Sequence, residues 1–292
     1  MKNKLSYFLS KRLTSLWQDI YFKNNEECLI LGSGSSIKSI NLDAFEGIPI
    51  ITCNLNMYLD SLNILNFILV NIPEPYFFAS NSRLFYKTFG LIKKNIKEDE
   101  IIELMQDWCR EIKRLKDINF LMHLTSITQF YRNRNVYYFL KGCYDGANNR
   151  FVPHNFLDSN NFGGSFYSCL TSAYLAGFKK CYIFGFDSFT LTECSNTRFY
   201  EKDKPNKKNN LNNTQKAFYN YLNKKMNLQV LTLPGQQSLL NSRQIKSIFK
   251  KINYQKEIEG INLFSEKKRK LITDFNNICI KNKNLSSKLF YA

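Results

Sequence analysis

The amino-acid sequence predicts an α/β protein built on one doubly wound, mostly parallel sheet, with helical extensions at both ends. Two observations support this prediction. Short apolar segments alternate with helix-compatible ones, and several apolar segments stop at a glycine, asparagine or aspartate. The chain has 292 residues, of which 44% are hydrophobic, so it can bury a large core. We therefore expect a single Rossmann-like domain rather than a disordered chain.

The expected strands are short, and helix-compatible segments separate several of them. The strands are 27–31, 48–53, 65–70, 120–122, 136–140, 181–184 and 228–233. A polar, helix-compatible stretch follows the first strand, and further helices are expected within 76–117, 163–176 and 214–226. The chain then divides into a basic amphipathic helix over 1–24, an α/β domain over 25–240 with a mobile loop at 188–213, and a basic helical extension over 241–292.

The net charge of +17 is concentrated at the two ends of the chain. Residues 1–24 and 241–292 together hold twelve of the seventeen excess positive charges. Basic arms bind nucleic acid or anionic lipid. The sequence has no helix-turn-helix, zinc-finger or RNA-recognition pattern, so we do not expect nucleic acid as a partner. An anionic membrane surface stays open as a partner.

The first 24 residues carry one apolar stripe flanked by cations, which is typical of an amphipathic helix. The stripe residues are Leu5, Phe8, Leu9, Leu13, Leu16, Trp17 and Ile20. Such a helix either lies at a membrane interface or packs on its own domain, and we favour packing. The sequence has neither the roughly 18 uninterrupted apolar residues of a membrane span nor the apolar region of a signal peptide. We expect a cytoplasmic protein, with peripheral attachment to the inner face of the membrane left open.

The eight cysteines are scattered, and none forms a CxxC pair. His123 and His154 are the two histidines of the chain. We expect neither a zinc site nor disulfides, and we interpret the cysteines as buried free thiols. His123 lies in an apolar segment and is expected to be structural, whereas His154 lies in a polar loop and is a candidate acid or base.

Small or polar residues follow four of the expected strands, which is where ligands bind in open parallel sheets. These residues are Gly32-Ser33-Gly34, Asn54, Asn71 and Asp187. The loop 32–36 can bend tightly and offer N–H groups to an anion, but Ile37 replaces the third glycine of the dinucleotide fingerprint. A plain strand–helix turn explains this loop equally well. The asparagines are either turn residues or amides that bracket a base, ribose or sugar, and Asp187 is most simply a helix cap.

A second loop of small residues, 160–165, precedes the helix expected at 163–176. No carboxylate occurs in that helix, so nothing repels an anion from its N-terminus. Close helix packing also explains Gly163, Gly164 and Ser165. Two such loops in one α/β chain favour nucleotide binding over coincidence.

Taken in order, these segments resemble the bacterial sialyltransferases of glycosyltransferase family 42. They also resemble the wider superfamily of flagellar motility accessory factors and hydroxymethylpterin diphosphokinase-like proteins. The matching segments are 31–37, 52–54, 70–73, 163–187, 216–234 and 238–240, within residues 27–240. The block from Gly163-Gly164-Ser165 to Gly185-Phe186-Asp187 is specific to the superfamily rather than to one activity. The resemblance implies a GT-A-like variant of the Rossmann-like fold.

The resemblance also implies that the strand ends and the second loop hold a cytidine monophosphate (CMP) donor. On this basis the donor-binding residues are Gly32, Ser33, Gly34, Asn54, Asn71, Asn161, Gly163, Gly164 and Ser165. Members of the family invert the anomeric centre without a metal, and a histidine after the aspartate strand serves as general base. This chain has no histidine in 188–213. Phe189 replaces the tyrosine that supports the leaving phosphate, and Asn160 or Asn161 replaces a carboxylate-binding arginine.

Other residues must then supply the chemistry of these missing side chains. Tyr200, Arg198 or Lys202 can donate hydrogen bonds to the phosphate, and His154 or Asp187 can act as the base. The candidate catalytic residues are therefore His154, Asp187 and Tyr200.

The expected function is an inverting, metal-independent transfer of sialic acid or a related acidic sugar from a CMP-sugar donor. The acceptor is a surface glycan or a lipid-linked glycan, and a basic surface suits both anionic substrates. Two alternatives are a Mg²⁺-dependent phosphotransferase similar to the pterin diphosphokinases and a non-catalytic nucleotide- or glycan-binding module. A third is a basic membrane- or nucleic-acid-associated protein whose loops are only structural. No cofactor is expected for the favoured function, and self-association into a homo-oligomer is left open.

Overall fold

The computed structural model describes residues 2–23, 26–62, 65–73, 96–123, 126–130, 132–139, 165–187, 199, 213–254 and 264–281. One sheet of eight parallel strands forms its centre, in the spatial order β5-β4-β3-β2-β1-β6-β7-β8. The strands are β1 (Glu27–Leu31), β2 (Pro49–Cys53), β3 (Asn66–Ile72), β4 (Asn119–His123), β5 (Val136–Phe139), β6 (Lys180–Phe184), β7 (Asn227–Thr232) and β8 (Ser242–Gln244). The predicted α/β class and doubly wound sheet are confirmed.

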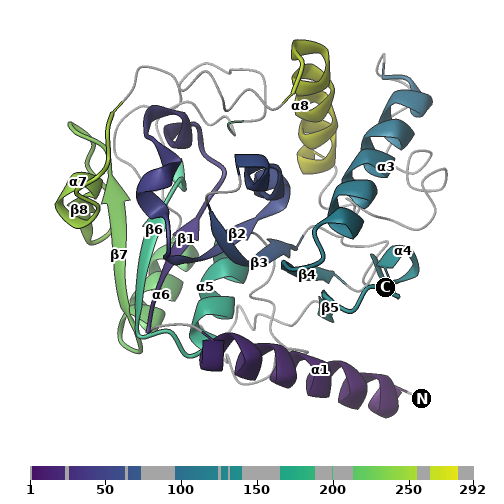
Figure 1. The fold of residues 1–292 in the computed structure, drawn as a ribbon, viewed down its shortest axis with the longest axis horizontal. Helices are drawn as coiled ribbons and strands as arrows, with labels where there is room; N and C mark the ends of the chain where they lie inside the picture. The colour runs from purple at the N-terminus through teal and green to yellow at the C-terminus, as the bar shows by residue number, and fades with distance from the viewer. Residues whose placement is uncertain are drawn as a thin grey trace.

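The order in which the chain adds strands to the sheet changes direction after β5. The change is located in the sheet between the neighbouring strands β1 and β6. From β1 the sheet grows through β2 and β3 to β4 and β5, and β6 then pairs on the other side of β1 and continues to β7 and β8 (Figure 1). Such a reversal is a topological switch point, and ligands bind there beyond the carboxyl ends of the strands. The residues that follow β1 and β6 are the glycine loop 32–36 and Gly185-Phe186-Asp187.

Helices cover both faces of the sheet. They are α1 (Lys2–Lys23), η1 (Ser35–Ser39), η2 (Leu42–Phe45), η3 (Asn54–Leu62), α3 (Glu98–Arg114), α4 (Ile127–Phe130), α5 (Ser165–Leu175), α6 (Asn213–Asn223), α7 (Ile245–Ile248) and α8 (Glu266–Lys281). Leu29 and Leu31 point into the core shared with η1–η3, α3, α7 and α8. Cys28 and Ile30 point into the core shared with α1, α5 and α6. Alternation along one strand therefore gives the chain two separate cores.

The structure differs from the predicted elements in several places. The stretch after β1 forms two short 3₁₀ helices, η1 and η2, because only 17 residues separate Leu31 from Pro49. The sheet also continues past the predicted boundary at residue 240, through β8. β8 is three mostly polar residues long, and that pattern does not predict a strand.

Helix α5 lies directly against β1, β2 and β3 because its inner face carries small side chains. Ser168, Cys169 and Ser172 are fully buried there. Gly177 ends the helix with a φ of 81°, a backbone conformation that side chains with a Cβ rarely adopt. A Cβ at this position would also lie 2.6 Å from the ring of Tyr21. The small side chains of α5 thus set how closely the helix approaches the strands.

Helix α1 packs on the domain over the part of its length whose side chains are described. Leu13, Leu16, Trp17 and Ile20 are buried against the core on the α5 side of the sheet, and α1 runs beside β5 along the lower edge of the view (Figure 1). The Arg12 guanidinium donates to the carbonyl oxygens of Arg134 and Val136, 3.0 and 3.2 Å away. It thereby covers outward-facing backbone groups of the edge strand β5. The described half of the predicted apolar stripe therefore packs against the core of its own domain, in agreement with the prediction.

None of the described helices is long and apolar enough to cross a membrane.

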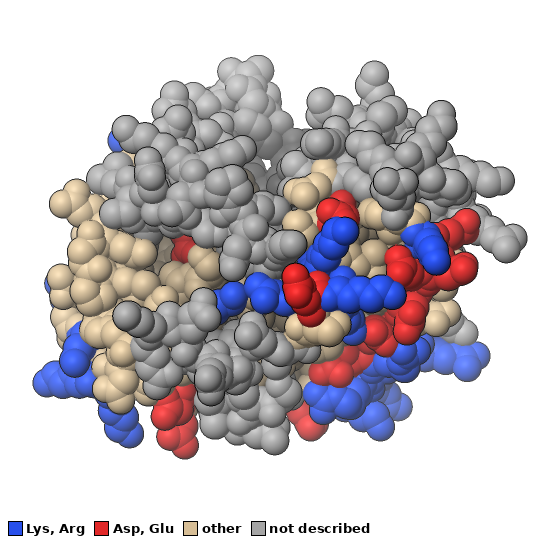
Figure 2. Space-filling model, turned by 90° about the horizontal axis from the view of Figure 1, so that it is seen from above, with Lys and Arg blue, Asp and Glu red and all other residues tan. Residues whose placement is uncertain are grey.

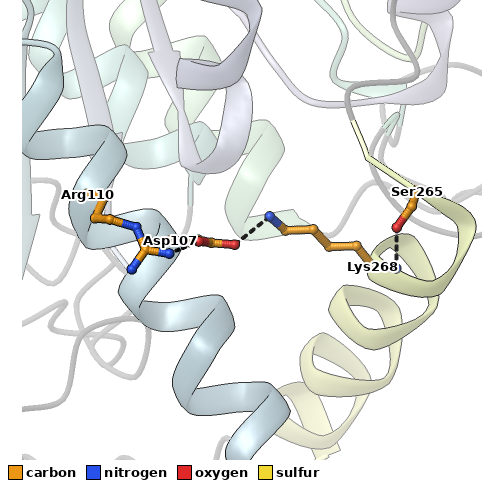
Figure 3. Close-up of polar contacts among 4 residues, drawn as sticks. All are labelled: Asp107, Arg110, Ser265 and Lys268. Carbon is orange, nitrogen blue, oxygen red and sulfur yellow. Dashed lines mark hydrogen bonds and ion pairs between the residues drawn. The ribbon is translucent and has the colours of Figure 1, made fainter.

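Helix α8 is held against α3 by apolar packing and by ion pairs. The rings of Trp108 and Phe275 lie 5.9 Å apart between the two helices. Lys268 bonds Asp107 at 2.7 Å, and Asp107 also bonds Arg110 on its own helix (Figure 3). Ser265 caps α8 by accepting a hydrogen bond from the backbone N–H of Lys268. Basic and acidic side chains accordingly lie side by side over this part of the molecule (Figure 2).

Candidate functional site

The bend after β1 lies in close contact with the bend after β6. The N–H of Gly32 donates to the carbonyl oxygen of Phe184 at 2.7 Å, and the N–H of Gly34 donates to that of Gly185 at 2.6 Å. A Cβ on Gly32 would lie only 2.3 Å from the Gly185 oxygen, so a side chain there would force the two strand ends apart. The glycines predicted for ligand binding are therefore required first by the approach of two strands at the switch point.

Asp187 occupies the anion position of the glycine loop. Its carboxylate accepts hydrogen bonds from the backbone N–H of Ser36 at 3.0 Å, from the Ser36 hydroxyl, and from the Ser35 hydroxyl at 3.2 Å. Burial raises the pKa of Asp187, and the hydrogen bonds from Ser36 and Ser35 oppose that rise. The residue is a helix cap, as expected, but a buried one that joins β6 to η1 across 151 residues of sequence.

Asn54 and Ser165 are brought together from opposite halves of the chain. Asn54 begins η3 with a φ of 53°, and its Nδ2 donates to the Ser165 hydroxyl at 2.9 Å. Ser165 is the first residue of α5, and the first turn of that helix has no acidic side chain. The Asn54 side chain is buried, and its Oδ1 has no hydrogen-bond partner among the described residues. Two predicted donor-binding residues thus meet at a helix N-terminus and leave one buried acceptor unused.

Asn71 is fully engaged within the protein. It lies inside β3 rather than after it, because the strand extends to Ile72. Its Oδ1 accepts hydrogen bonds from the hydroxyls of Ser168 and Ser172, at 2.8 and 3.0 Å, and its Nδ2 faces the Thr52 carbonyl oxygen at 3.4 Å. These contacts anchor α5 on β2 and β3. Asn71 thus fixes the helix that carries Ser165, and its assignment to donor binding stays a prediction.

Asn56 is a central residue of this region that the sequence did not single out. Its Nδ2 lies 2.7 Å from the Gly32 carbonyl oxygen, 2.7 Å from the Thr52 hydroxyl and 3.1 Å from the Leu31 carbonyl oxygen. It is fully buried in η3, two residues after Asn54. A second asparagine just after a strand was the available signal, but nothing local indicates that it reaches back to β1.

Several predicted residues lie outside the described residues. They are His154, Asn160, Asn161, Gly163, Gly164, Phe189, Arg198, Tyr200 and Lys202. The loop expected at 188–213 also lies outside them, apart from Phe199 and Asn213. Phe199 is buried, and its N–H donates to the Ser33 carbonyl oxygen at 2.9 Å. Ser33, a predicted donor-binding residue, is therefore in contact with Phe199 of that loop.

The cysteine, histidine and acidic side chains of the described residues are not grouped as metal ligands would be. No group of three or more His, Cys, Asp or Glu side chains suited to a metal ion occurs in the described part of the chain. Cys28, Cys53, Cys169 and Cys181 are buried free thiols, as predicted, whereas Cys109 is a free thiol that is only partly buried. His123 is buried at the end of β4, with its ring 5.7 Å from that of Phe139, in keeping with a structural role.

A separate hollow of about 260 Å³ lies between α3 and α8. It is lined by Glu100, Glu103, Leu104, Asp107, Ser265, Lys267, Lys268 and Leu271. Lys267 pairs with Glu100 at 3.1 Å and Lys268 pairs with Asp107, so most of its charges neutralise one another. None of the predicted site residues lines it.

Comparisons of the chain with protein-family models, with curated proteins and with solved structures found no match.

Proposed function

We propose that the protein is an inverting glycosyltransferase that takes an acidic sugar, such as sialic acid, from a CMP-sugar donor. The observation that carries the proposal is the Asn54–Ser165 contact at the end of β2, the strand next to the switch point. It combines a buried acceptor, the Asn54 Oδ1, which has no partner in the described part of the chain, with the start of an 11-residue helix whose first turn has no acidic side chain. A nucleoside phosphate supplies the matching groups, namely hydroxyl or amino donors for the Asn54 Oδ1 and an anion for the helix N-terminus.

The two small-residue loops would divide the ligand between them. Because the Asp187 carboxylate already fills the anion position of the loop 32–36, we assign the phosphate to the start of α5. The Gly32 bend would lie against the nucleoside, since a backbone without a Cβ permits close approach. The same carboxylate would repel additional phosphates, which favours a donor with a single phosphate over a nucleoside di- or triphosphate.

In the proposed reaction, an acceptor hydroxyl oxygen attacks the anomeric carbon of the sugar. The bond from that carbon to the phosphate oxygen breaks, and CMP leaves with the electron pair. The α5 N-terminus stabilises the charge that develops on the phosphate. A general base takes the proton of the acceptor hydroxyl. We assign this role to His154 rather than Asp187, because both Asp187 oxygens accept hydrogen bonds from Ser35 or Ser36.

The phosphotransferase alternative is less well supported by the described residues. Mg²⁺ in such enzymes is held by carboxylates. Among the strand ends that meet at the switch point, the carboxylate that the structure describes is Asp187, and it is committed to η1. We therefore keep the glycosyltransferase as the proposed function.

The test is isothermal titration calorimetry of the full chain with CMP and with ATP, each with and without Mg²⁺. We expect CMP to bind without Mg²⁺ with a Kd below about 1 mM. Incubation with CMP-sialic acid and a glycan acceptor should then release CMP, and His154→Asn should slow that release at least about tenfold. Binding of ATP only with Mg²⁺ would overturn the proposal in favour of a phosphotransferase. CMP binding without CMP release would instead indicate a binding module.

A further inference from the structure

The carbonyl oxygens at the end of β1 are held by side chains from the β2–η3 connection. The N–H of Gly32 pairs with β6, but Gly32 also has a carbonyl oxygen that is buried beside β2. Asn56 Nδ2 approaches that oxygen at 2.7 Å and the Thr52 hydroxyl at the same distance. The Thr52 hydroxyl in turn donates to the Leu31 carbonyl oxygen at 2.7 Å. One amide and one hydroxyl therefore contact both backbone carbonyl oxygens at the end of β1.

This network requires a donor at position 56. Three oxygen atoms surround the Asn56 Nδ2, so the amide can face them only with its NH₂ group. Its Oδ1 is turned away and has no partner among the described residues. A carboxylate in its place would put negative charge against those oxygens. The contacts are thus specific for the asparagine amide.

The network also connects the two parts of the proposed nucleotide site. Asn54 and Asn56 lie in the first turn of η3, and their side chains reach different elements. Asn54 contacts Ser165 at the start of α5, whereas Asn56 contacts Gly32 at the bend of β1. This turn of η3 therefore links the Gly32 bend to the start of α5 through side-chain hydrogen bonds.

We propose that Asn56, assisted by Thr52, is the positioning residue that fixes the Gly32 bend relative to the Asn54–Ser165 pair. It touches backbone rather than ligand, and it sets nucleotide affinity through the placement of the bend. This inference rests on the proposed nucleotide site.

The experiment compares CMP affinity and thermal stability in Asn56→Ala and in a matched control, Asn135→Ala. Asn135 Nδ2 also bonds two backbone carbonyl oxygens, those of Leu115 and Ile118 at 2.9 and 2.7 Å, but it lies before β5 and away from the site. Both variants should lower the Tm, because both remove hydrogen bonds to backbone carbonyl oxygens. Only Asn56→Ala should weaken CMP binding, by at least about tenfold.

A second pair of variants applies if Asn56→Ala does not fold. Thr52→Val removes the hydroxyl with little change of shape and should weaken CMP binding about threefold or more, whereas Thr52→Ser keeps the hydroxyl and should retain wild-type affinity. CMP affinity within twofold of wild type in folded Asn56→Ala, or in Thr52→Val, overturns this inference alone. A wild-type protein that binds no CMP overturns the proposed function, and this inference with it.

Discussion

Asn54 joins an uncommon backbone conformation to a contact between two elements. Its φ of 53° lies in the left-handed region, which asparagine tolerates better than most residues. That conformation turns the chain from β2 into η3 and directs the carboxamide toward Ser165. The asparagine is therefore the turn residue that the sequence offered as one alternative, and its contact with a nucleotide, the other alternative, stays a prediction.

Substitutions at Asn54 can separate these two roles. Asn54→Gly keeps the left-handed backbone and removes the amide, so we expect a Tm near that of wild type and a CMP affinity about tenfold lower. Asn54→Ala removes the amide and adds backbone strain of about 1–2 kcal/mol, so it should lose affinity and stability together. Thermal unfolding and calorimetric titration of both variants provide the measurement. Unchanged CMP affinity in Asn54→Gly would remove Asn54 from the site.

Asp187 should give the protein a pH dependence of a particular sign. Burial raises the pKa of Asp187 above its ordinary value of 3.8, so the native state takes up this proton more readily than the unfolded state. The contribution of this carboxyl to stability is therefore greatest at low pH, and it is lost as the pH rises from about 4 through the native pKa.

Asp187→Asn removes this titration while keeping an acceptor for the Ser36 N–H. Relative to wild type, the variant should gain stability as the pH rises from about 4 to about 7, as measured by urea unfolding at several pH values. A loss of stability of the variant relative to wild type over the same rise in pH would mean that the hydrogen bonds from Ser35 and Ser36 outweigh burial.

At the scale of elements, the α3–α8 contact combines a fixed apolar centre with an electrostatic rim. Phe275 and Ile272 on α8 are buried, whereas Lys267 and Lys268, in the first turn of α8, line the hollow between α3 and α8. Cations in a first helical turn are unfavourable for the helix dipole. The carboxylates of α3 offset that cost through the Lys267–Glu100 and Lys268–Asp107 ion pairs.

Lys268 and Lys267 form a matched pair for testing this rim. The Lys268 and Asp107 side chains are 29% and 27% exposed, whereas the Lys267 side chain is 83% exposed. We expect Lys268→Met to cost up to about 1 kcal/mol in unfolding free energy at low salt and less at 1 M salt, while Lys267→Met changes stability by less than about 0.5 kcal/mol.

The Lys268 contribution should also depend on pH. Burial raises the pKa of Asp107, but the hydrogen bonds and charges of Lys268 and Arg110 bring it below its ordinary value. The stabilisation is therefore present at neutral pH and lost as the pH falls below about 4. Equal effects of the two lysine variants under all these conditions would show that the ion pair adds nothing.

At the scale of the whole molecule, the sequence predicted the sheet far better than the contacts that assemble the site. Alternating apolar segments and helices are local patterns, and they located β1 to β7 and the helices α5 and α6. β8 carries no such pattern. The glycines and asparagines at the strand ends were recognised because turn residues and ligand-binding residues share the same chemistry.

Long-range hydrogen bonds account for what the sequence could not indicate. Asp187 reaches Ser36, and Asn56 reaches back to Gly32, but neither contact follows from neighbouring residues. The assignment of Asn71 to ligand binding likewise could not anticipate that Ser168 and Ser172 would take up its Oδ1. These pairings depend on strand order across the switch point, and only the fold determines that order.

The most direct test of the account is a crystal structure of the full chain bound to CMP. We predict that the phosphate lies at the first turn of α5 beside Ser165, with the Asn54 Oδ1 accepting a hydrogen bond from the nucleoside and Asp187 still bonded to Ser36. CMP bound in the groove between α3 and α8, or a phosphate that displaces Asp187 from the loop 32–36, would contradict it.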